Sequence, residues 1–105
     1  MSQFVVYKNP NPSSKKLYPY ILDVQSNLLE LLETRLVIPL ASKSSFLDKE
    51  IKDLTPTLSI EKMEYILLTQ QMAAIHKKKL GSFVYDCSAD RHKILSSIDF
   101  LITGY

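Results

Sequence analysis

Only the end of the chain, from Ser88 onward, has the residue spacing of an amphipathic helix. Ser88 is a good N-cap residue, Asp90 suits the positive end of a helix dipole, and Gly104 suits a helix stop. The apolar residues fall at i, i+1, i+4, i+7 and i+8, and they are Ile94, Leu95, Ile98, Leu101 and Ile102. We predict one helix here, with Ile94, Leu95, Ile98 and Leu101 in the core. Strands and loops are expected elsewhere.

The rest of the chain contains short runs of β-branched, aromatic and aliphatic residues, which are typical of strands. The predicted strands are residues 4–7, 18–25, 35–41, 57–60, 65–69 and 72–75, with a further one within 80–85. Pro39 cannot donate a backbone hydrogen bond, so residues 35–41 are predicted to form an edge strand or a strand end. Short strands separated by turn signals indicate a compact β-barrel or sandwich.

Three connections stand between these runs. Residues 8–16 hold two prolines, two asparagines and two serines, which predict a loop. Residues 42–53 are predicted to be a long loop with one helical turn. Residues 27–34 contain four leucines and are either a wide connection or a helical turn, because periodicity does not decide between them.

Composition excludes several classes of protein. With 13 basic and 11 acidic residues the net charge is +2, too small for the electrostatic footprint of a dedicated nucleic-acid binder. The single cysteine, Cys87, cannot form an intrachain disulfide, which fits a reducing compartment. The N-terminal apolar run is too short for a signal peptide or a membrane helix. We expect one cytoplasmic domain spanning residues 1–105, with no membrane contact.

The sequence contains no catalytic or cofactor motif. Its two glycines, Gly81 and Gly104, cannot build a glycine-rich phosphate loop. His76 and His92 have no cysteine pair or carboxylate at ligand spacing, so no metal site is expected. Cys87 has no catalytic signature around it. We predict a binding protein with no catalytic residue and no cofactor.

Two groups of charges need a separate interpretation. Asp23 and Arg35 lie beside the predicted strands and could either pair structurally or orient the loop near Leu28, and we favour the structural role. Residues 77–79 are three lysines in a row. They could touch phosphate, but the modest net charge favours a solvated turn.

The most distinctive motifs are two runs separated by residues 27–34. The first is Leu22-Asp23-Val24-Gln25-Ser26 and the second is Arg35-Leu36-Val37-Ile38-Pro39-Leu40-Ala41. Together, at this spacing, they resemble the CcdB family of toxins that poison DNA gyrase. Further similarities follow in order: residues 4–7 resemble the family's first strand, 54–56 its mid-chain turn and 72–73 its central strand, and 98–101 lead into a glycine plus one terminal residue.

The resemblance implies a mainly β fold of the SH3-like barrel type, with an antiparallel sheet of five strands, a smaller second sheet and a C-terminal helix. It also implies a homodimer that acts as the toxin of a type II toxin–antitoxin system. Such a toxin binds the GyrA subunit of gyrase and traps the cleaved-DNA complex. A CcdA-like antitoxin neutralises it by wrapping a disordered segment around the dimer, and the pair regulates its own transcription. The toxin would contact DNA only indirectly, through gyrase or the antitoxin complex.

The resemblance also implies which residues bind these partners. The gyrase-binding residues, carried over by position, are Leu28, Ser96, Asp99, Ile102, Thr103, Gly104 and Tyr105. The antitoxin-binding residues are Lys8, Asn9, Asn11, Ser42, Lys43 and Ser44. The family places a stacking aromatic residue before the glycine, where this chain has Thr103, whereas its own aromatic residue, Tyr105, follows the glycine. Either Tyr105 takes over the stacking or the contacts with gyrase differ.

Two other functions are alternatives. MazF and Kid toxins share the barrel type and cut RNA, but they carry a glycine-rich N-terminal stretch and an Arg-Pro-Ala-Val-like strand. This chain lacks those glycines and has Arg35-Leu36-Val37-Ile38-Pro39 instead. The second alternative is an inactive module that still binds an antitoxin. RNA cleavage without gyrase would favour the first, and expression without growth arrest would favour the second.

Overall fold

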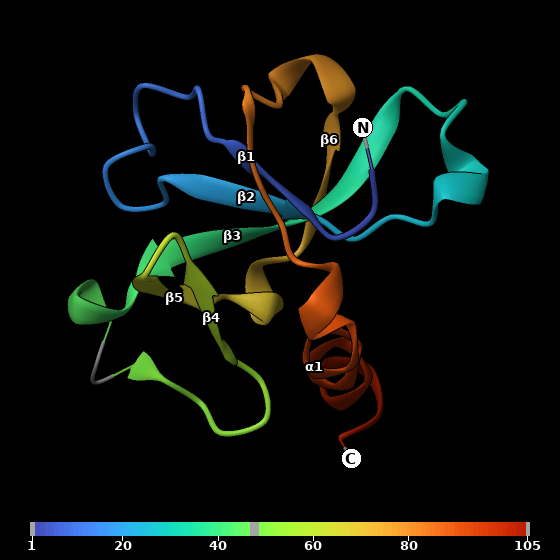
Figure 1. Ribbon diagram of the computed structural model, residues 1–105. Helices are drawn as coiled ribbons and strands as arrows, with labels where there is room; N and C mark the ends of the chain where they lie inside the picture. Colours follow the sequence, from blue (N-terminus) through green and yellow to red (C-terminus); the bar gives the residue numbers. More distant parts are fainter. Residues whose placement is uncertain (1, 47–48, 105) are drawn as a thin grey trace.

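The strands predicted from the sequence are all present in the computed structural model, which describes residues 2–46 and 49–104 (Figure 1). Within these residues the strands are β1 (Val5–Lys8), β2 (Tyr20–Asp23), β3 (Thr34–Ser42), β4 (Thr57–Ile60), β5 (Met63–Leu67), β6 (Ala73–His76) and β7 (Phe83–Asp86). The helix is α1 (Arg91–Thr103). Short 3₁₀ turns are η1 (Asn27–Leu29), η2 (Lys43–Ser45), η4 (Thr69–Gln71), η5 (Lys77–Lys79) and η6 (Ser88–Asp90). The undecided segment 27–34 therefore begins with a helical turn.

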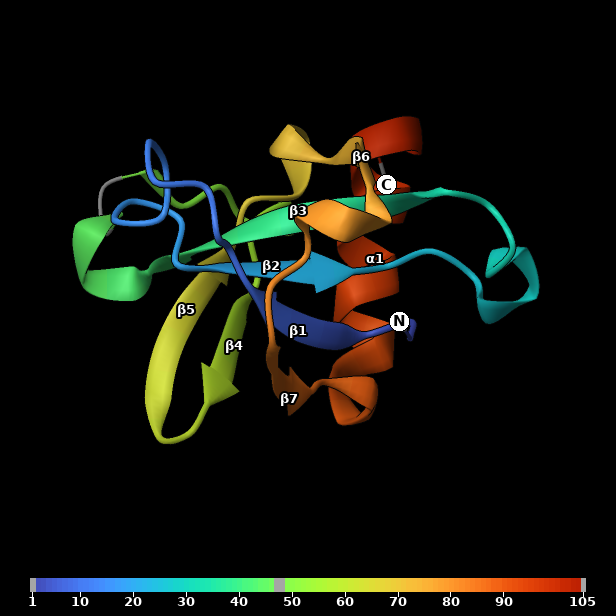
Figure 2. The ribbon, with the colours of Figure 1, turned by 90° about the horizontal axis from the view of Figure 1, so that it is seen from above.

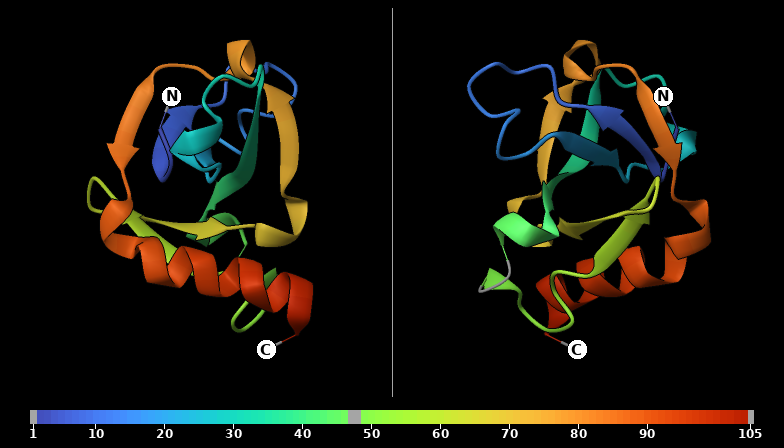
Figure 3. Two further views of the ribbon diagram at one scale, coloured as in Figure 1. Left: turned by 90° about the vertical axis from the view of Figure 1, so that its right-hand side faces the viewer. Right: turned by 60° about the vertical axis from the view of Figure 1, so that its left-hand side comes forward.

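The described strands form one antiparallel sheet of seven strands in the order β4-β5-β3-β2-β1-β7, and β6 also pairs with β3. The sheet curves into a half-barrel, and α1 lies across one side of it (Figures 2 and 3). The β4–β5 hairpin reaches the other strands only through the end of β3. The expected sheet of five strands with a smaller second sheet is therefore corrected to one continuous sheet of the described strands, because β3 pairs with both β2 and β5.

β3 is a central strand with Pro39 in its interior, so the prediction of an edge strand or a strand end was wrong. One side of β3 pairs with β2, while the other pairs with β6 over residues 34–37 and with β5 over residues 40–42. Pro39 lies between the latter two pairings, and its carbonyl oxygen accepts a hydrogen bond from the N–H of Leu68 at 3.0 Å. Because the N and C=O of a strand residue point to the same side, the missing donor faces this gap and breaks no ladder bond.

The main core lies between the sheet and α1. Its buried residues are Phe4, Val6, Leu22, Val24, Ile38, Leu40, Leu58, Ile60, Leu67, Cys87 and Ile94. Leu95 and Ile98 pack against this cluster, as predicted from the helical spacing. Leu101 was also predicted to be core, but it is 38% exposed, because it lies almost a turn beyond Ile98, the last α1 residue that packs on the cluster.

A buried polar contact fixes α1 to the turn before β6. The hydroxyl of Ser97 donates to the carbonyl oxygen of Ile94 at 2.7 Å and lies 3.0 Å from the hydroxyl of Thr69 in η4. Both hydroxyl groups are fully buried and satisfied. The exposed face of α1 is thereby held in one orientation relative to the sheet.

The two ends of α1 differ in how well they were predicted. Ser88 does not cap the helix, because it lies in η6 and donates both its N–H and its hydroxyl to Asp86, and α1 begins after Asp90. These bonds stabilise the carboxylate and lower the pKa of Asp86. At the other end, Gly104 adopts a left-handed φ of 79° and donates to the carbonyl oxygen of Phe100, which is the predicted stop.

Candidate partner-binding surfaces

The exposed face of α1 carries three of the predicted gyrase-binding residues in one row. Ser96, Asp99 and Thr103 are all exposed, and their spacing of three and four residues places them on the same face of the helix. The hydroxyl of Thr103 donates to the backbone carbonyl of Asp99 at 2.7 Å. Ile102 lies beside this row and is 72% exposed. The row thus offers hydroxyl and carboxylate groups next to one large apolar side chain.

The glycine after α1 is not crowded on the side where a Cβ would lie. No atom lies within 4 Å of the position that a Cβ on Gly104 would take. Gly104 is therefore required by its positive φ and not by crowding within the chain. The predicted role of Tyr105 falls outside the described residues.

Toward its N-terminus, the exposed face of α1 borders a hollow that was not predicted from the sequence. It has a volume of about 650 Å³ and is lined by Asp53, Pro56, Thr57, His92, Lys93 and Ser96. The ammonium group of Lys93 donates to the carbonyl oxygen of Thr57 at 3.0 Å, which closes one side of it. Ser96 thus belongs both to the exposed row and to this hollow.

Leu28 lies apart from the other predicted gyrase-binding residues. It is 95% exposed in η1, on a loop that projects from the sheet away from the C-terminal end of α1 (Figures 1 and 2). The structure therefore brings the helix residues together, but within one copy of the chain it does not bring Leu28 to them.

The loop that carries Leu28 is held at its base by the predicted ion pair. Arg35 Nε lies 2.7 Å from Asp23 Oδ2, and both side chains are buried, which confirms the pairing. Arg35 Nη2 also donates to the carbonyl oxygen of Gln25, whose side chain donates to the carbonyl of Leu29 at 3.2 Å. The pair is thus structural and also positions the loop, so the two roles considered for it are compatible.

The predicted antitoxin-binding residues lie on two separate loops. Lys8 ends β1, and Asn9 and Asn11 belong to the connection that follows it. There Asn9 donates to the hydroxyl of Ser14 and to the carbonyl of Tyr18 and accepts from the N–H of Asn11. These bonds give a polar loop a fixed shape. The other set, Ser42, Lys43 and Ser44, lies in and around η2.

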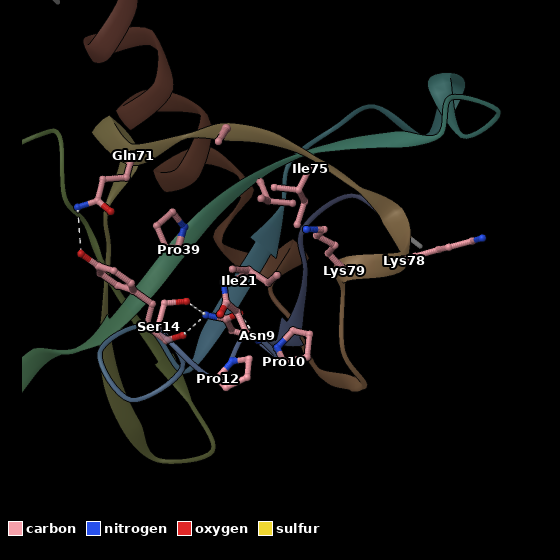
Figure 4. A pocket seen from close by; sticks show the side chains of 14 residues that line it. Asn9, Pro10, Pro12, Ser14, Ile21, Pro39, Gln71, Ile75, Lys78 and Lys79 are labelled. Atoms are coloured by element: carbon pink, nitrogen blue, oxygen red, sulfur yellow. Dashed lines mark hydrogen bonds between the residues drawn. The ribbon is translucent and has the colours of Figure 1, made fainter.

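The loop of Asn9 and Asn11 forms one wall of a second hollow, the lysine hollow, shown in Figure 4. It has a volume of about 610 Å³, and its lining residues are Asn9, Pro10, Asn11, Pro12, Ser14, Tyr18, Ile21, Val37, Pro39, Gln71, Ala73, Ile75, Lys78 and Lys79. The floor is apolar and comes from β2, β3 and β6. Figure 4 shows Lys79 reaching over the hollow beside Ile75, whereas the amino group of Lys78 points away from it.

The charge around the lysine hollow is of one sign. None of its lining residues is Asp or Glu, and no carboxylate lies within 4.0 Å of Lys78 or Lys79 among the described residues. Residues 77–79 form the turn η5 with Lys78 and Lys79 exposed, as predicted. The hollow beside them was not predicted, because its lining comes from segments far apart in sequence. The chemistry of the hollow fits a partner with apolar and anionic side chains.

The chemistry of Cys87 argues against a nucleophilic thiol. Its side chain is buried in the main core, and burial, assisted by the charges of Asp90 and Asp86, raises the pKa of Cys87 to about 12. The thiol is therefore neutral at physiological pH and serves as a small apolar core residue.

In the described part of the chain, no helix is both long and apolar enough for a transmembrane segment.

A model of the CcdB family, described as CcdB protein, matches residues 3–104 of this sequence. The match covers nearly the whole chain, from the residue before Phe4 to Gly104. It includes both distinctive motifs, residues 22–26 and 35–41.

Proposed function

This chain belongs to the CcdB family of non-enzymatic toxins that poison DNA gyrase, and from that premise we propose that the exposed end of α1 and the tail after it bind the GyrA subunit. The observation that carries the proposal is the row of Ser96, Asp99 and Thr103 beside the exposed Ile102. These side chains are exposed, and among the described residues their polar groups make one hydrogen bond, from Thr103 to the carbonyl of Asp99. Family membership also decides against an RNA-cleaving toxin.

Poisoning of this kind needs no covalent chemistry. The toxin has to bind gyrase more tightly when its DNA is cleaved than when it is sealed, and this difference in affinity sets the shift in population. Driving a two-state equilibrium from 1:99 to 99:1 requires roughly a 10⁴-fold preference for one state. A set of several anchoring residues on one surface can supply such a preference if they fit only the open enzyme. Because gyrase acts in the cytoplasm, we place the toxin there.

We propose that the toxin acts as a homodimer. Support comes from apolar surface where α1 meets η4: Leu101 is 38% exposed, and Met72 and Ile98 are only partly buried. A two-fold dimer would present two copies of the tail to the paired GyrA subunits. Light scattering should give twice the chain mass of 12.0 kDa. A monomer at micromolar concentration that still poisons gyrase would contradict this part of the proposal.

We propose that the CcdA-like antitoxin places an extended segment with acidic and apolar residues in the lysine hollow. The support is the apolar floor, the fixed loop of Asn9 and Asn11, and the uncompensated charge of Lys79. Ser42, Lys43 and Ser44 would contact another part of the antitoxin. Lys79→Glu should weaken antitoxin binding and leave gyrase poisoning intact, whereas equal affinity for the antitoxin would rule the hollow out.

A gyrase cleavage assay with ATP tests the main proposal. The intact protein should cause linear DNA to accumulate, and a variant lacking Gly104 and Tyr105 should not, because the tail contacts are lost. Circular dichroism should show the truncated variant to be folded, since the hydrogen bond from Gly104 to Phe100 closes only the last turn of α1 and the core packs on residues further up the helix. Poisoning by the folded truncation would exclude the tail. Expression in a sensitive bacterium without growth arrest would indicate an inactive antitoxin-binding module.

A further inference from the structure

The turn η5, which carries Lys79 to the lysine hollow, is held by the backbone at both of its ends. At its start, the N–H of Lys77 donates to the carbonyl oxygen of Glu33 at 2.8 Å. Just beyond its end, the N–H of Gly81 donates to the carbonyl oxygen of Lys8 at 2.9 Å. A Cβ on Gly81 would lie 2.6 Å from that oxygen, so this close approach requires glycine.

One side chain, the imidazole of His76, caps η5. His76 ends β6 and directly precedes the three lysines. Its Nδ1 accepts the N–H of Lys78 at 3.1 Å, and thereby supplies a partner for one of the donors that the start of a helical turn leaves free. Its Nε2 lies 3.9 Å from Oε2 of Glu33. The ring is thus held between an N–H group and a carboxylate.

The bond to Lys78 requires one protonation state of His76. Nδ1 of an imidazole accepts a hydrogen bond only when it carries no proton, so the capping form is the neutral ring with its proton on Nε2, toward Glu33. In the doubly protonated ring, the N–H of Nδ1 would face the N–H of Lys78, and the cap is lost. The contact with Glu33 strengthens at the same time, because it then joins opposite charges. Protonation therefore exchanges one partner of His76 for the other.

Loss of the cap affects the position of Lys79. Figure 4 shows Lys79 over the hollow, whereas the amino group of the preceding Lys78 points away from it. Because the two lysines are neighbours, the winding of η5 decides which of them reaches the hollow. An η5 turn without its cap no longer fixes Lys79 there. A side chain that has to be ordered on binding lowers the affinity for a partner.

We infer that His76 is a positioning residue for the antitoxin, whose neutral imidazole holds Lys79 over the lysine hollow and whose protonation releases it. The inference rests on the proposed function, in which Lys79 attracts an acidic antitoxin segment. His76 is not among the described residues that line the hollow, so it acts through η5. An ordinary histidine gains its proton between roughly pH 8 and pH 5. The antitoxin should therefore bind more weakly at the acidic end of this range.

The other charges near His76 are compatible with this direction. They are the carboxylate of Glu33 and the ammonium groups of residues 77–79. On β3, the paired residue Thr34 is uncharged, and the following Arg35 is already paired with a buried carboxylate. The positive charge that protonation adds is compensated locally by Glu33. The antitoxin segment therefore meets the loss of the cap more than the gain of a charge.

Substitutions that keep or remove the cap test the inference. Binding of purified full-length CcdA-like antitoxin is measured by biolayer interferometry for the intact toxin, His76→Ala and His76→Asn. Asparagine has a side-chain oxygen that can cap the turn and does not titrate, whereas alanine has none. At about pH 8, His76→Ala should bind about fivefold more weakly than the intact toxin, and His76→Asn equally well. At about pH 5.5, the intact toxin should bind about fivefold more weakly than His76→Asn.

Two controls locate the effect at η5. Ser26→Ala removes the same kind of cap from η1, where the hydroxyl of Ser26 accepts the N–H of Leu28 at 3.2 Å, and it should leave antitoxin binding unchanged. Circular dichroism should show every variant to be folded. In the free toxin, nuclear magnetic resonance should show the amide of Lys78 shifting together with the imidazole of His76 as the pH falls. An amide that does not follow the imidazole would overturn the inference without reference to the antitoxin.

The binding outcomes separate this role of His76 from the proposed function. If Lys79→Glu binds the antitoxin as well as the intact toxin does, the proposed antitoxin site fails. If Lys79→Glu weakens binding and His76→Ala does not, the site stands and the role of His76 is refuted. Failure of His76→Asn to restore the affinity lost in His76→Ala would mean that the ring contacts the antitoxin directly, which also overturns the inference. So would tighter binding of the intact toxin than of His76→Asn in acid, because the added charge would then decide.

Discussion

The buried pair of Asp23 and Arg35 joins β2 to β3 and anchors the loop between these two strands. Arg35→Met removes the cation and leaves a buried carboxylate without its partner. We expect a loss of about 3–5 kcal/mol in the free energy of unfolding, measured by urea denaturation. The control Lys43→Met removes a partly exposed partner of Glu50 at 3.9 Å and should cost less than about 1 kcal/mol. Equal losses would contradict the structural role of the pair.

Cys87 gives a second prediction at the residue scale. Raising a thiol pKa from 9.0 to about 12 lowers the thiolate fraction at pH 8 about a thousandfold. Because the thiolate is the reactive form, native protein should resist an aromatic disulfide reagent at pH 8. Unfolding in urea should restore labelling at the rate of a free cysteine. Rapid labelling of the native protein would show that the side chain is accessible and ionised.

The turn of the β4–β5 hairpin has a locally unfavourable sequence. Its two central residues, Glu61 and Lys62, have φ values of 52° and 70°, and the strands pair on both sides of them from Ile60 to Met63. A two-residue turn with positive φ at both positions favours Asn-Gly. The double change Glu61→Asn and Lys62→Gly should add about 1 kcal/mol of stability and raise Tm by roughly 4 °C in a thermal melt.

A glycine control shows whether that gain comes from the turn. Glu64→Gly places glycine within β5, where φ is not positive, and should lower stability by roughly 0.5–1 kcal/mol. A gain from glycine at both places would mean that something other than the backbone angle is responsible.

The elements show which sequence patterns carry enough information. The strand runs and the spacing of Ile94 and Ile98 predicted buried faces correctly, because those residues do pack in the core. Residues 27–34 could not be assigned, because their leucines are exposed and periodicity reports only on burial. Pro39 misled the prediction, because a residue without an N–H is normally tolerated only where no neighbouring strand needs that donor. In β3 such a place exists inside the sheet, since β5 and β6 share one side of the strand and leave Pro39 between them.

The candidate surfaces also differ in how far the sequence could predict them. The row on α1 could be predicted, since Ser96, Asp99 and Thr103 are close in sequence and a helix fixes their common face. The lysine hollow could not be predicted, because its floor and walls come from three strands, a loop, η4 and η5. Its chemistry exists only after the sheet has brought those segments together.

At the scale of the whole molecule, the two sides of the sheet contribute to different surfaces. Neighbouring residues of a strand point to opposite faces, so Leu22 packs under α1 while Ile21 lies in the floor of the lysine hollow. The helix surface proposed for gyrase and the hollow proposed for the antitoxin therefore lie on opposite sides of the sheet. Changes to one can be made without direct contact with the other. Toxicity and neutralisation are thus expected to be separable by mutation.

The gap that Pro39 leaves along β3 has a consequence for motion. Because β5 and β6 meet β3 on either side of this gap, β6 can detach without unpairing β5. Ile66 and Leu67 of β5 are fully buried, whereas the residues of β6 are half-buried or exposed. Native-state hydrogen exchange should find the amides of β6 exchanging by local opening and those of β5 only on global unfolding. A common rate for both strands would refute this. Because Ala73 and Ile75 of β6 lie in the floor of the lysine hollow, local opening of β6 can change the shape of this hollow while the toxin remains folded.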